Sequence, residues 1–313
     1  MMYSRYLLPF AVCVLLSVRL TAQSTDNVLP FVAMDRDPVN AALAGAGLSA
    51  VSGADLSYAT FGNPAAVPFM DRHFDLGVNY SMWAPSVWKD HIVNAGGAFK
   101  VGKWFALTVG FARDMHAEEI YNGKPFKPYD MVVGGGLAFS IARCVGIGVN
   151  IKYAHQQMMS DYRLWGVSMD AFLQYHGKDF NVMAGVTNFG PKAQSTVVPT
   201  KYDLVPVARV SGDYVARVGI VHLQPALSGE FAFNRQWAVA AGFQLGVKDI
   251  GWLRAGYRYA SAGSAMPSHF ALGAGATFYG VRISATWLTA NKEIGNTFMI
   301  GLGYSLVRRS RVN

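Results

Sequence analysis

Apolar residues alternate with small or polar residues at a period of two along most of the chain. Between residues 145 and 153, Val145, Ile147, Val149, Ile151 and Tyr153 fall on one face, opposite glycine, Asn and Lys. The same alternation recurs over residues 237–247, 270–278, 281–287 and 298–306. A period of two is the signature of β-strands. We therefore expect an all-β protein with about fourteen antiparallel strands of about ten residues each.

The residues on the second face of these strands distinguish a soluble β-sandwich from a membrane β-barrel. In a half-buried strand of a soluble sandwich, the polar face is rich in Lys, Glu and Thr, whereas here it is mostly Gly, Ala and Ser. Small residues suit the inner wall of a membrane barrel whose lumen is filled by another segment. Aromatic residues near strand ends also fit the girdles of such a barrel. These aromatic residues are Trp83, Trp88, Trp104, Trp237, Trp252, Tyr279 and Trp287.

The connections between the predicted strands alternate in length. Short connections are expected near residues 102, 143, 176–177, 248–249 and 279–280, and longer ones at 114–130, 190–204 and 261–267. Short periplasmic turns and long outer loops are the rule for outer-membrane barrels. Between residues 206 and 233 we expect two strands, with one or three as the alternatives. An even strand number would place both chain ends in the periplasm.

The two chain ends differ in pattern from the barrel at residues 73–306. Residues 1–22 have a basic start at Arg5, an apolar stretch and a small-residue site at Ala22, which predicts a secretory signal peptide. Residues 23–72 do not alternate. We expect them to fold back as a plug, or hatch, inside the barrel, with a periplasmic linker as the alternative. Residues 307–313 form a basic tail.

Composition supports export and gives no sign of catalysis. Charged residues are 15% of the chain, well below the usual value of about 25%, and there are 33 glycines. One cysteine, Cys144, remains after the signal peptide, so no internal disulfide is expected. The net charge of +8 is spread over strands and turns, which argues against a nucleic-acid partner. No phosphate loop, nucleophile elbow or metal-type histidine pair is present, so we expect no enzyme activity and no cofactor.

Charge on the predicted barrel wall and on the hatch has opposite sign. The alternation turns four basic residues into the lumen, and the hatch carries three acids. The basic residues are Lys152, Arg254, Arg258 and Arg282, and the acids are Asp35, Asp37 and Asp55. Because a buried charge is costly unless it is paired, these groups could lock the hatch to the wall. An open lumen that favours anions is the alternative.

A turn at the end of the hatch is the second candidate feature. Pro64 fixes its own φ and pushes Asn63 out of the helical region, so the Asn63 side chain can close a turn onto nearby backbone. Ala65 leaves room for the barrel wall to approach. We expect Asn63, Pro64 and Ala65 to seat the hatch, and an ordinary loop is the alternative.

Several short motifs, in this order, resemble the PorV/PorQ family of Bacteroidota, which is related to FadL-type barrels. They are Asp37-Pro38, the run from Ala44 to Gly47, Asn63-Pro64-Ala65, the run from Gly148 to Lys152, Asp170 with Tyr175, the run from Thr187 to Gly190, and the run from Leu253 to Arg258. The resemblance implies a fourteen-stranded barrel of the Gram-negative outer membrane with an N-terminal hatch. The chain is short for a PorV-like member, and it ends in a basic tail where many outer-membrane barrels end in an aromatic residue.

Three functions follow from the resemblance. The first is a non-catalytic barrel that binds partner or cargo proteins in type IX secretion or a related outer-membrane machine. The second is a FadL-like transporter of small hydrophobic molecules. The third is a structural accessory of another machine. All three have outer-membrane lipid as a neighbour, and the first and third add other outer-membrane or secretion-system proteins.

Overall fold

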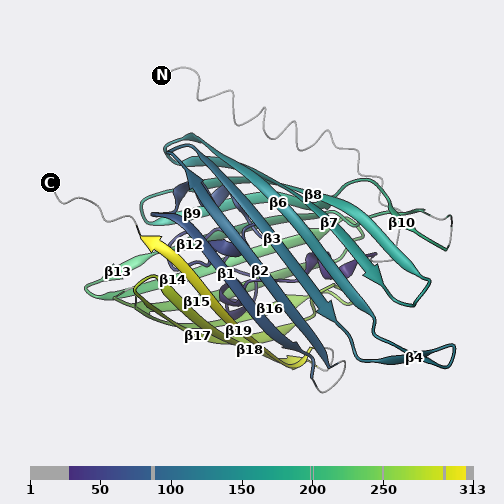
Figure 1. Ribbon diagram of the computed structural model, residues 1–313. Helices are drawn as coiled ribbons and strands as arrows, with labels where there is room; N and C mark the ends of the chain where they lie inside the picture. Colours follow the sequence, from purple (N-terminus) through teal and green to yellow (C-terminus); the bar gives the residue numbers. More distant parts are fainter. Residues whose placement is uncertain are drawn as a thin grey trace.

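The structure is a computed structural model that describes residues 28–307, with gaps at 86–88, 198, 200, 249 and 292–293. Long antiparallel strands pair in sequence order, and the last pairs with the first, so that the sheet closes into a barrel (Figure 1). Fourteen long strands form the wall, which confirms the predicted fold. They are β1 (Arg72–Trp83), β2 (Asp90–Val101), β3 (Phe105–Met115), β6 (Tyr129–Ala142), β7 (Val145–Gln157), β8 (Arg163–His176), β9 (Phe180–Phe189), β12 (Val207–Tyr214), β14 (Val221–Ala232), β15 (Trp237–Val247), β16 (Gly251–Ala260), β17 (His269–Phe278), β18 (Val281–Asn291) and β19 (Gly295–Val307).

The remaining elements are short and lie in connections or before the wall. Four helical turns precede β1: η1 (Pro30–Ala33), α2 (Pro38–Ala42), η2 (Leu56–Tyr58) and η3 (Pro64–Phe69). The short strands are β4 (Glu119–Tyr121), β5 (Lys124–Phe126), β10 (Ala193–Ser195), β11 (Lys201–Tyr202) and β13 (Ala216–Val218). The predicted signal peptide at 1–22 and residues 308–313 of the basic tail lie outside the described residues.

The wall has an apolar outer face and an inner face of small and polar residues. In β7, Val149 and Ile151 are 49% and 58% exposed, whereas Asn150 between them is 1% exposed. The other long strands repeat this pattern, as the exposed Leu, Val, Ile and Phe side chains of β3, β15 and β19 illustrate. A soluble sandwich buries its large apolar side chains, so this arrangement indicates a wall that faces lipid.

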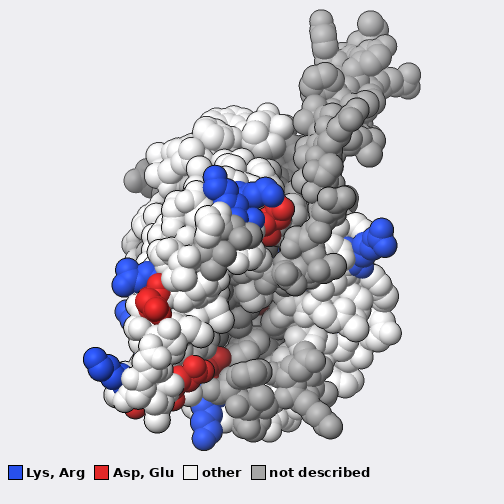
Figure 2. Space-filling view, turned by 90° about the vertical axis from the view of Figure 1, so that its right-hand side faces the viewer, with Lys and Arg blue, Asp and Glu red and all other residues white. Residues whose placement is uncertain are grey.

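The two ends of the barrel differ in the length of the connections between the strands. Tight turns join β2 to β3, β6 to β7, β8 to β9, β15 to β16 and β17 to β18, and both ends of the wall, at Arg72 and Val307, lie at this short-turn end. At the β17–β18 turn, Tyr279 and Gly280 have φ values of 50° and 84°, as a two-residue type I′ hairpin requires. The longer connections lie at the opposite, long-loop end, which Figure 2 views from outside. No helix in the described ranges is long and apolar enough to cross a membrane.

Two of the tryptophans that were expected in the aromatic girdles face the lumen instead of the lipid. Trp252 is only 8% exposed and faces the lumen beside Gly246, because Leu253 takes the outward position of β16. Trp83 likewise packs against an inner cluster that includes Ala41 and Met266. The glycine opposite Trp252 leaves room for the indole, so the side chain follows the inward parity of its strand. Trp104, Trp237 and Tyr279 are exposed and Trp287 is half-buried, whereas Trp88 lies outside the described residues.

Candidate functional site

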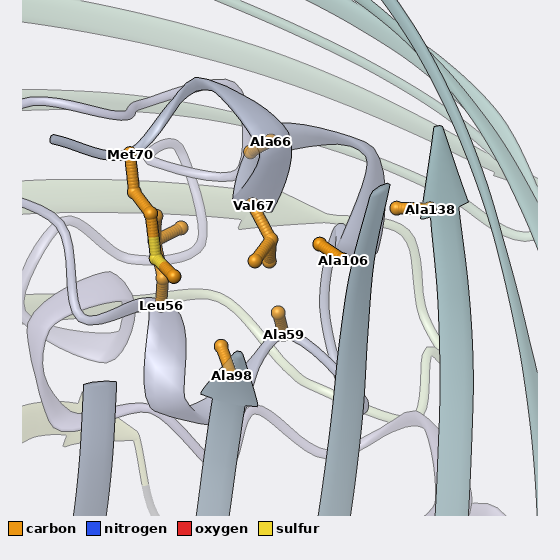
Figure 3. Close-up of a cluster of buried hydrophobic side chains, with 8 residues drawn as sticks. All are labelled: Leu56, Ala59, Ala66, Val67, Met70, Ala98, Ala106 and Ala138. Carbon is orange, nitrogen blue, oxygen red and sulfur yellow. The ribbon is translucent and has the colours of Figure 1, made fainter. Parts of the chain in front are cut away.

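The barrel encloses residues 28–71, which we term the N-terminal segment. At the long-loop end, Leu29 and Phe31 pack against inward residues of the wall: Ala112, Val132, Ala154 and Leu164. At the short-turn end, Val67 and Met70 pack against Ala98, Ala106 and Ala138 on β2, β3 and β6 (Figure 3). The segment therefore crosses the lumen from one end of the barrel to the other before the chain enters β1.

Inward glycines let the backbone of the N-terminal segment approach the wall closely. A β-carbon at Gly148 would lie 2.6 Å from the Ala65 nitrogen, and one at Gly242 would lie 2.9 Å from the Leu43 carbonyl oxygen. The backbone of the segment approaches Gly96, Gly146 and Gly256 in the same way, and its side chains contact Gly77, Gly110, Gly134, Gly273 and Gly301. The small inner face of the strands thus matches the volume of the segment that it surrounds.

The predicted turn at Asn63, Pro64 and Ala65 forms the start of η3. The Asn63 side chain accepts a hydrogen bond from the Ala65 backbone nitrogen at 3.0 Å, which caps the helix. Its amide nitrogen donates to the Leu48 carbonyl oxygen at 3.0 Å and to the Gln174 side chain on β8 at 2.7 Å. Because the Asn63 side chain is almost fully buried, each of these bonds satisfies a group that water does not reach.

Among the three predicted acids, Asp55 makes an ion pair with a predicted basic residue. Arg282 on β18 donates to Asp55 through Nε at 3.1 Å and through Nη2, and it also donates to Asp75 on β1 at 2.9 Å. Arg72 contacts Asp75 at 2.8 Å. Two arginines and two aspartates therefore join the N-terminal segment to β1 and β18, and they balance in charge.

Asp35 and Asp37 do not pair with the basic wall. Asp35 accepts hydrogen bonds from the Asp37 backbone nitrogen and the Asn40 side chain, and Asp37 caps α2 through the Val39 nitrogen. Burial raises the pKa of Asp35 to about 6, although those hydrogen bonds and Arg209 oppose the shift. Burial also raises the pKa of Asp37, and the nearby Asp55 and Asp35 carboxylates add to the effect. These two acids organise the segment's own backbone.

The other three predicted basic residues do face the lumen and have partners chiefly on the wall. Lys152 pairs with Asp170 at 2.9 Å, and both side chains are almost fully buried. Arg258 pairs with Glu230 at 2.6 Å. Arg254 donates to Gln244, and it also contacts the segment through the Gly53 carbonyl oxygen at 3.2 Å.

The sequence did not reveal one ion pair, in which the N-terminal segment supplies the basic residue and the wall supplies the acid. Arg36 of the N-terminal segment forms a bidentate ion pair with Asp114 on β3, with Nη2 donating to Oδ2 at 3.0 Å. The pattern of the chain predicts Asp114 in an outer connection, but it is the next-to-last residue of β3 and is 3% exposed. The alternation could have found it, because Phe111 and Arg113 face outward and Asp114 must then face inward.

Two adjoining cavities lie between the segment and the wall, toward the long-loop end. They have volumes of about 50 and 40 Å³, and part of the space around them is open to solvent. Ala33, Arg209, Glu230, Arg258 and Met266 line both. Their apolar lining includes Met34, Ala41, Ala44, Leu48, Phe61, Trp83, Val205, Val207 and Leu288. Glu230 lies between Arg209, at 3.7 Å, and Arg258, so three charged groups meet at the boundary of the two cavities.

Histidines do not converge on a common site in the described residues. His155 stacks on Tyr129, His222 lies beside Trp252, and His269 donates a hydrogen bond from Nδ1 to the Pro267 carbonyl oxygen. Within the same ranges, no group of three or more His, Cys, Asp or Glu side chains could hold a metal ion.

Comparison with known proteins gives a clear result for the fold. No family model matches the chain, and no curated protein sequence matches it. Among solved structures, it is similar to the CymD monoaromatic hydrocarbon channel, with a TM-score of 0.59 and 11% identity over 88% of this chain and 98% of that one. The Pseudomonas putida toluene transporter TodX matches with a TM-score of 0.59 and 10% identity over 87% and 99%. A Pseudomonas aeruginosa FadL homologue matches with a TM-score of 0.53 and 12% identity over 86% and 95%.

The chain therefore has the fold of the FadL-like outer-membrane channels. The resemblance to the narrower PorV/PorQ family stays a prediction. Two of these neighbours are described as a channel and a transporter, and neither description names an enzyme.

Proposed function

We propose that this protein is a FadL-like conduit for small hydrophobic molecules in a Gram-negative outer membrane, with the N-terminal segment as its hatch. The observation that carries the proposal is the pair of cavities at the long-loop end. They lie toward the long-loop end, apolar side chains and a few charged groups line them together, and the N-terminal segment lies beneath them. Apolar lining with a few placed polar groups is typical of sites for small ligands.

The charged groups at the boundary of the cavities are compatible with an apolar ligand. Glu230 is paired with Arg258 and lies near Arg209, and Asp35 also lines the second cavity near Arg209, so two acids face two arginines. A paired charge does not need a counter-ion from the ligand. The ligand class that fits is accordingly a small, uncharged hydrophobic molecule, such as a monoaromatic hydrocarbon.

The segment must move if a molecule is to pass through the lumen. Close contacts with inward glycines and the Asp55–Arg282 and Arg36–Asp114 ion pairs hold it against the wall. These contacts are distributed along the segment, so passage would require a local displacement on one side rather than its complete release. The side nearest the cavities is the strip of wall that carries Arg209, Glu230 and Arg258.

The hypothesis of a partner-binding barrel in type IX secretion has weaker support. Two of the solved neighbours are described as a hydrocarbon channel and a toluene transporter, which favours the conduit, and identities of about 10% bear on the fold alone. Other outer-membrane or secretion-system partners, and an origin in Bacteroidota, remain predictions from the sequence motifs. A stable protein that co-purifies from native membranes would support them.

Uptake of radiolabelled toluene by cells that lack the protein, with and without complementation, tests the conduit. The wild type should raise uptake above the empty vector. Ala33→Trp should return it to the vector level, because Ala33 lines both cavities and the indole would fill them. Ala285→Trp is the matched control, since Ala285 is exposed on the outer face of β18 and should leave uptake unchanged. Equal uptake by wild type and empty vector would refute the conduit for this ligand class.

A further inference from the structure

Basic side chains gather on the outer face of the barrel wall near its long-loop end. Arg113 is exposed on β3, His91 is exposed on β2, and Lys89 is exposed in the connection before β2. Lys127, 74% exposed at its side chain, lies just before β6. Together with Tyr80 and Tyr129 they line one groove with about 1360 Å³ of empty space, much of it open to the surroundings.

Neighbouring aromatic rings hold two of these side chains in place. The Arg113 guanidinium carbon lies 4.7 Å from the centre of the Tyr129 ring, a cation–π distance. The Tyr80 hydroxyl contacts His91 Nδ1 at 2.5 Å across the β1–β2 pair. Both side chains therefore lie against the outer face of the wall.

The outward apolar residues of the wall form a band around the barrel, and Arg113 lies at the edge of this band that is nearer the long-loop end. Below it on the same face of β3, the outward residues are Leu107, Val109 and Phe111, all exposed. An arginine is costly among acyl chains and favourable at headgroup level. The groove therefore lies where the headgroups of the outer leaflet begin.

The charges in the groove are not balanced by acids of the described residues. Arg113 and Lys89 have no acidic partner there, and Glu118 contacts Lys127 at 3.6 Å. Asp90 and Asp130 bind His116, at 3.0 and 3.1 Å. Burial lowers the pKa of His116, but hydrogen bonds to both carboxylates outweigh it and raise that pKa to about 10, so the ring is protonated at neutral pH. The groove thus keeps a net positive charge.

The strands from β14 to β19 lack this feature, although β19 pairs with β1. Near the long-loop ends of β14 to β19, the outward side chains are aromatic: Phe231, Trp237, Tyr259, Phe270, Trp287 and Phe298. In that part of the described wall, the outward face of the strands carries no Lys or Arg, and Arg235 is exposed in the connection between β14 and β15. The basic groove is therefore a local feature of β1, β2, β3 and β6. A ring of basic side chains around the whole barrel would also have appeared on the outward face of β14 to β19.

We propose that this groove binds the phosphorylated headgroup of an outer-leaflet glycolipid, with Arg113 and Lys89 as the principal phosphate ligands. The guanidinium offers a planar pair of donors for phosphate oxygens, and the ammonium adds a second charge. The acyl chains of the same lipid lie along Phe111 and the apolar residues below it. Charge complementarity and the apolar band beneath select a lipid of this chemistry.

Native mass spectrometry of the full barrel in detergent, titrated with lipid A, tests the proposal. The probe is bis-phosphorylated lipid A, compared with phosphate-free lipid A, in the presence of a chelator that prevents divalent bridging to Glu118. The wild type should bind the phosphorylated form about tenfold more tightly, the ratio that about 1.4 kcal/mol gives. Arg113→Gln combined with Lys89→Gln should reduce this preference to near one.

A matched control and a conservative variant make the result decisive. Lys103→Gln with Arg143→Gln removes the same number of exposed charges from the short-turn end and should keep the preference. Arg113→Lys should keep most of it. Heat-modifiable gel migration confirms that each variant is folded. The proposal is overturned if the wild type does not discriminate between the two lipids, or if the Arg113 and Lys89 double variant discriminates as well as the wild type.

Discussion

Buried charges in this barrel lie chiefly where the N-terminal segment meets the wall. Asp55 and Arg282 come from positions 227 residues apart, and Arg36 and Asp114 from positions 78 apart. The alternation of the strands was enough to predict that Arg254, Arg258 and Arg282 face the lumen. It could not predict their partners, because residues 28–71 have no periodicity from which the position of Asp55 or Asp35 can be derived.

The Asp55–Arg282 pair should contribute strongly to stability. Asp55→Asn leaves the buried Arg282 with Asp75 alone, which is shared with Arg72. Removal of one partner of a buried pair costs about 3 kcal/mol or more, because the remaining charge is uncompensated. We expect this loss in the free energy of unfolding, measured by urea titration of the barrel in lipid vesicles.

An exposed pair provides the control for this variant. Asp179 contacts Arg217 at 3.4 Å, and both side chains are more than 40% exposed. Asp179→Asn should therefore change the free energy of unfolding by less than about 1 kcal/mol. Similar losses in the two variants would mean that the Asp55 contact is not a specific anchor.

Among the secondary-structure elements, the strands of the wall could be predicted from the sequence, whereas the helical turns of the N-terminal segment could not. Strands such as β7 and β19 have a strict period of two, and their ends are marked by turn residues such as Tyr279 and Gly280. The helical turns of the segment are six residues or shorter, too short for a periodic signal. Only Asn63-Pro64 and Asp37-Pro38, each a cap followed by proline, marked where such turns begin.

The contact of η3 with β7 can be tested through one glycine. In Gly148→Ala the new β-carbon would lie 2.6 Å from the Ala65 nitrogen, so η3 must shift away from the wall. Overpacking of this kind costs about 1–3 kcal/mol. Amide hydrogen exchange in residues 65–70 should become about tenfold faster or more, since about 1.4 kcal/mol corresponds to a factor of ten.

Gly212 is the comparison position for this experiment. It lies in β12 with its nearest neighbour 3.5 Å from a built β-carbon, an ordinary contact distance. Gly212→Ala should leave exchange in residues 65–70 unchanged. If Gly148→Ala also leaves it unchanged, the close approach of Ala65 to β7 does not seat η3.

At the scale of the whole molecule, we propose a conduit that is closed by a segment which must move to let a molecule pass. The wall alone would enclose a continuous lumen, and the segment contacts it from β1 round to β19. Figure 1 shows the segment inside the barrel along its length. The short polar network of Ser49, Ser211 and Asp213 attaches it to β12, which forms part of the wall near the cavities.

A reversible disulfide across this network tests the claim most directly. The Ser49 and Ser211 oxygens are 3.2 Å apart, so Ser49→Cys with Ser211→Cys places two sulfur atoms within bonding range, and Cys144→Ser removes the native thiol. Toluene uptake should fall to the vector level when the pair is oxidised and recover after reduction. The Cys144→Ser protein without the pair should respond to neither treatment. Uptake at the wild-type rate through the oxidised, fully cross-linked barrel would contradict the account.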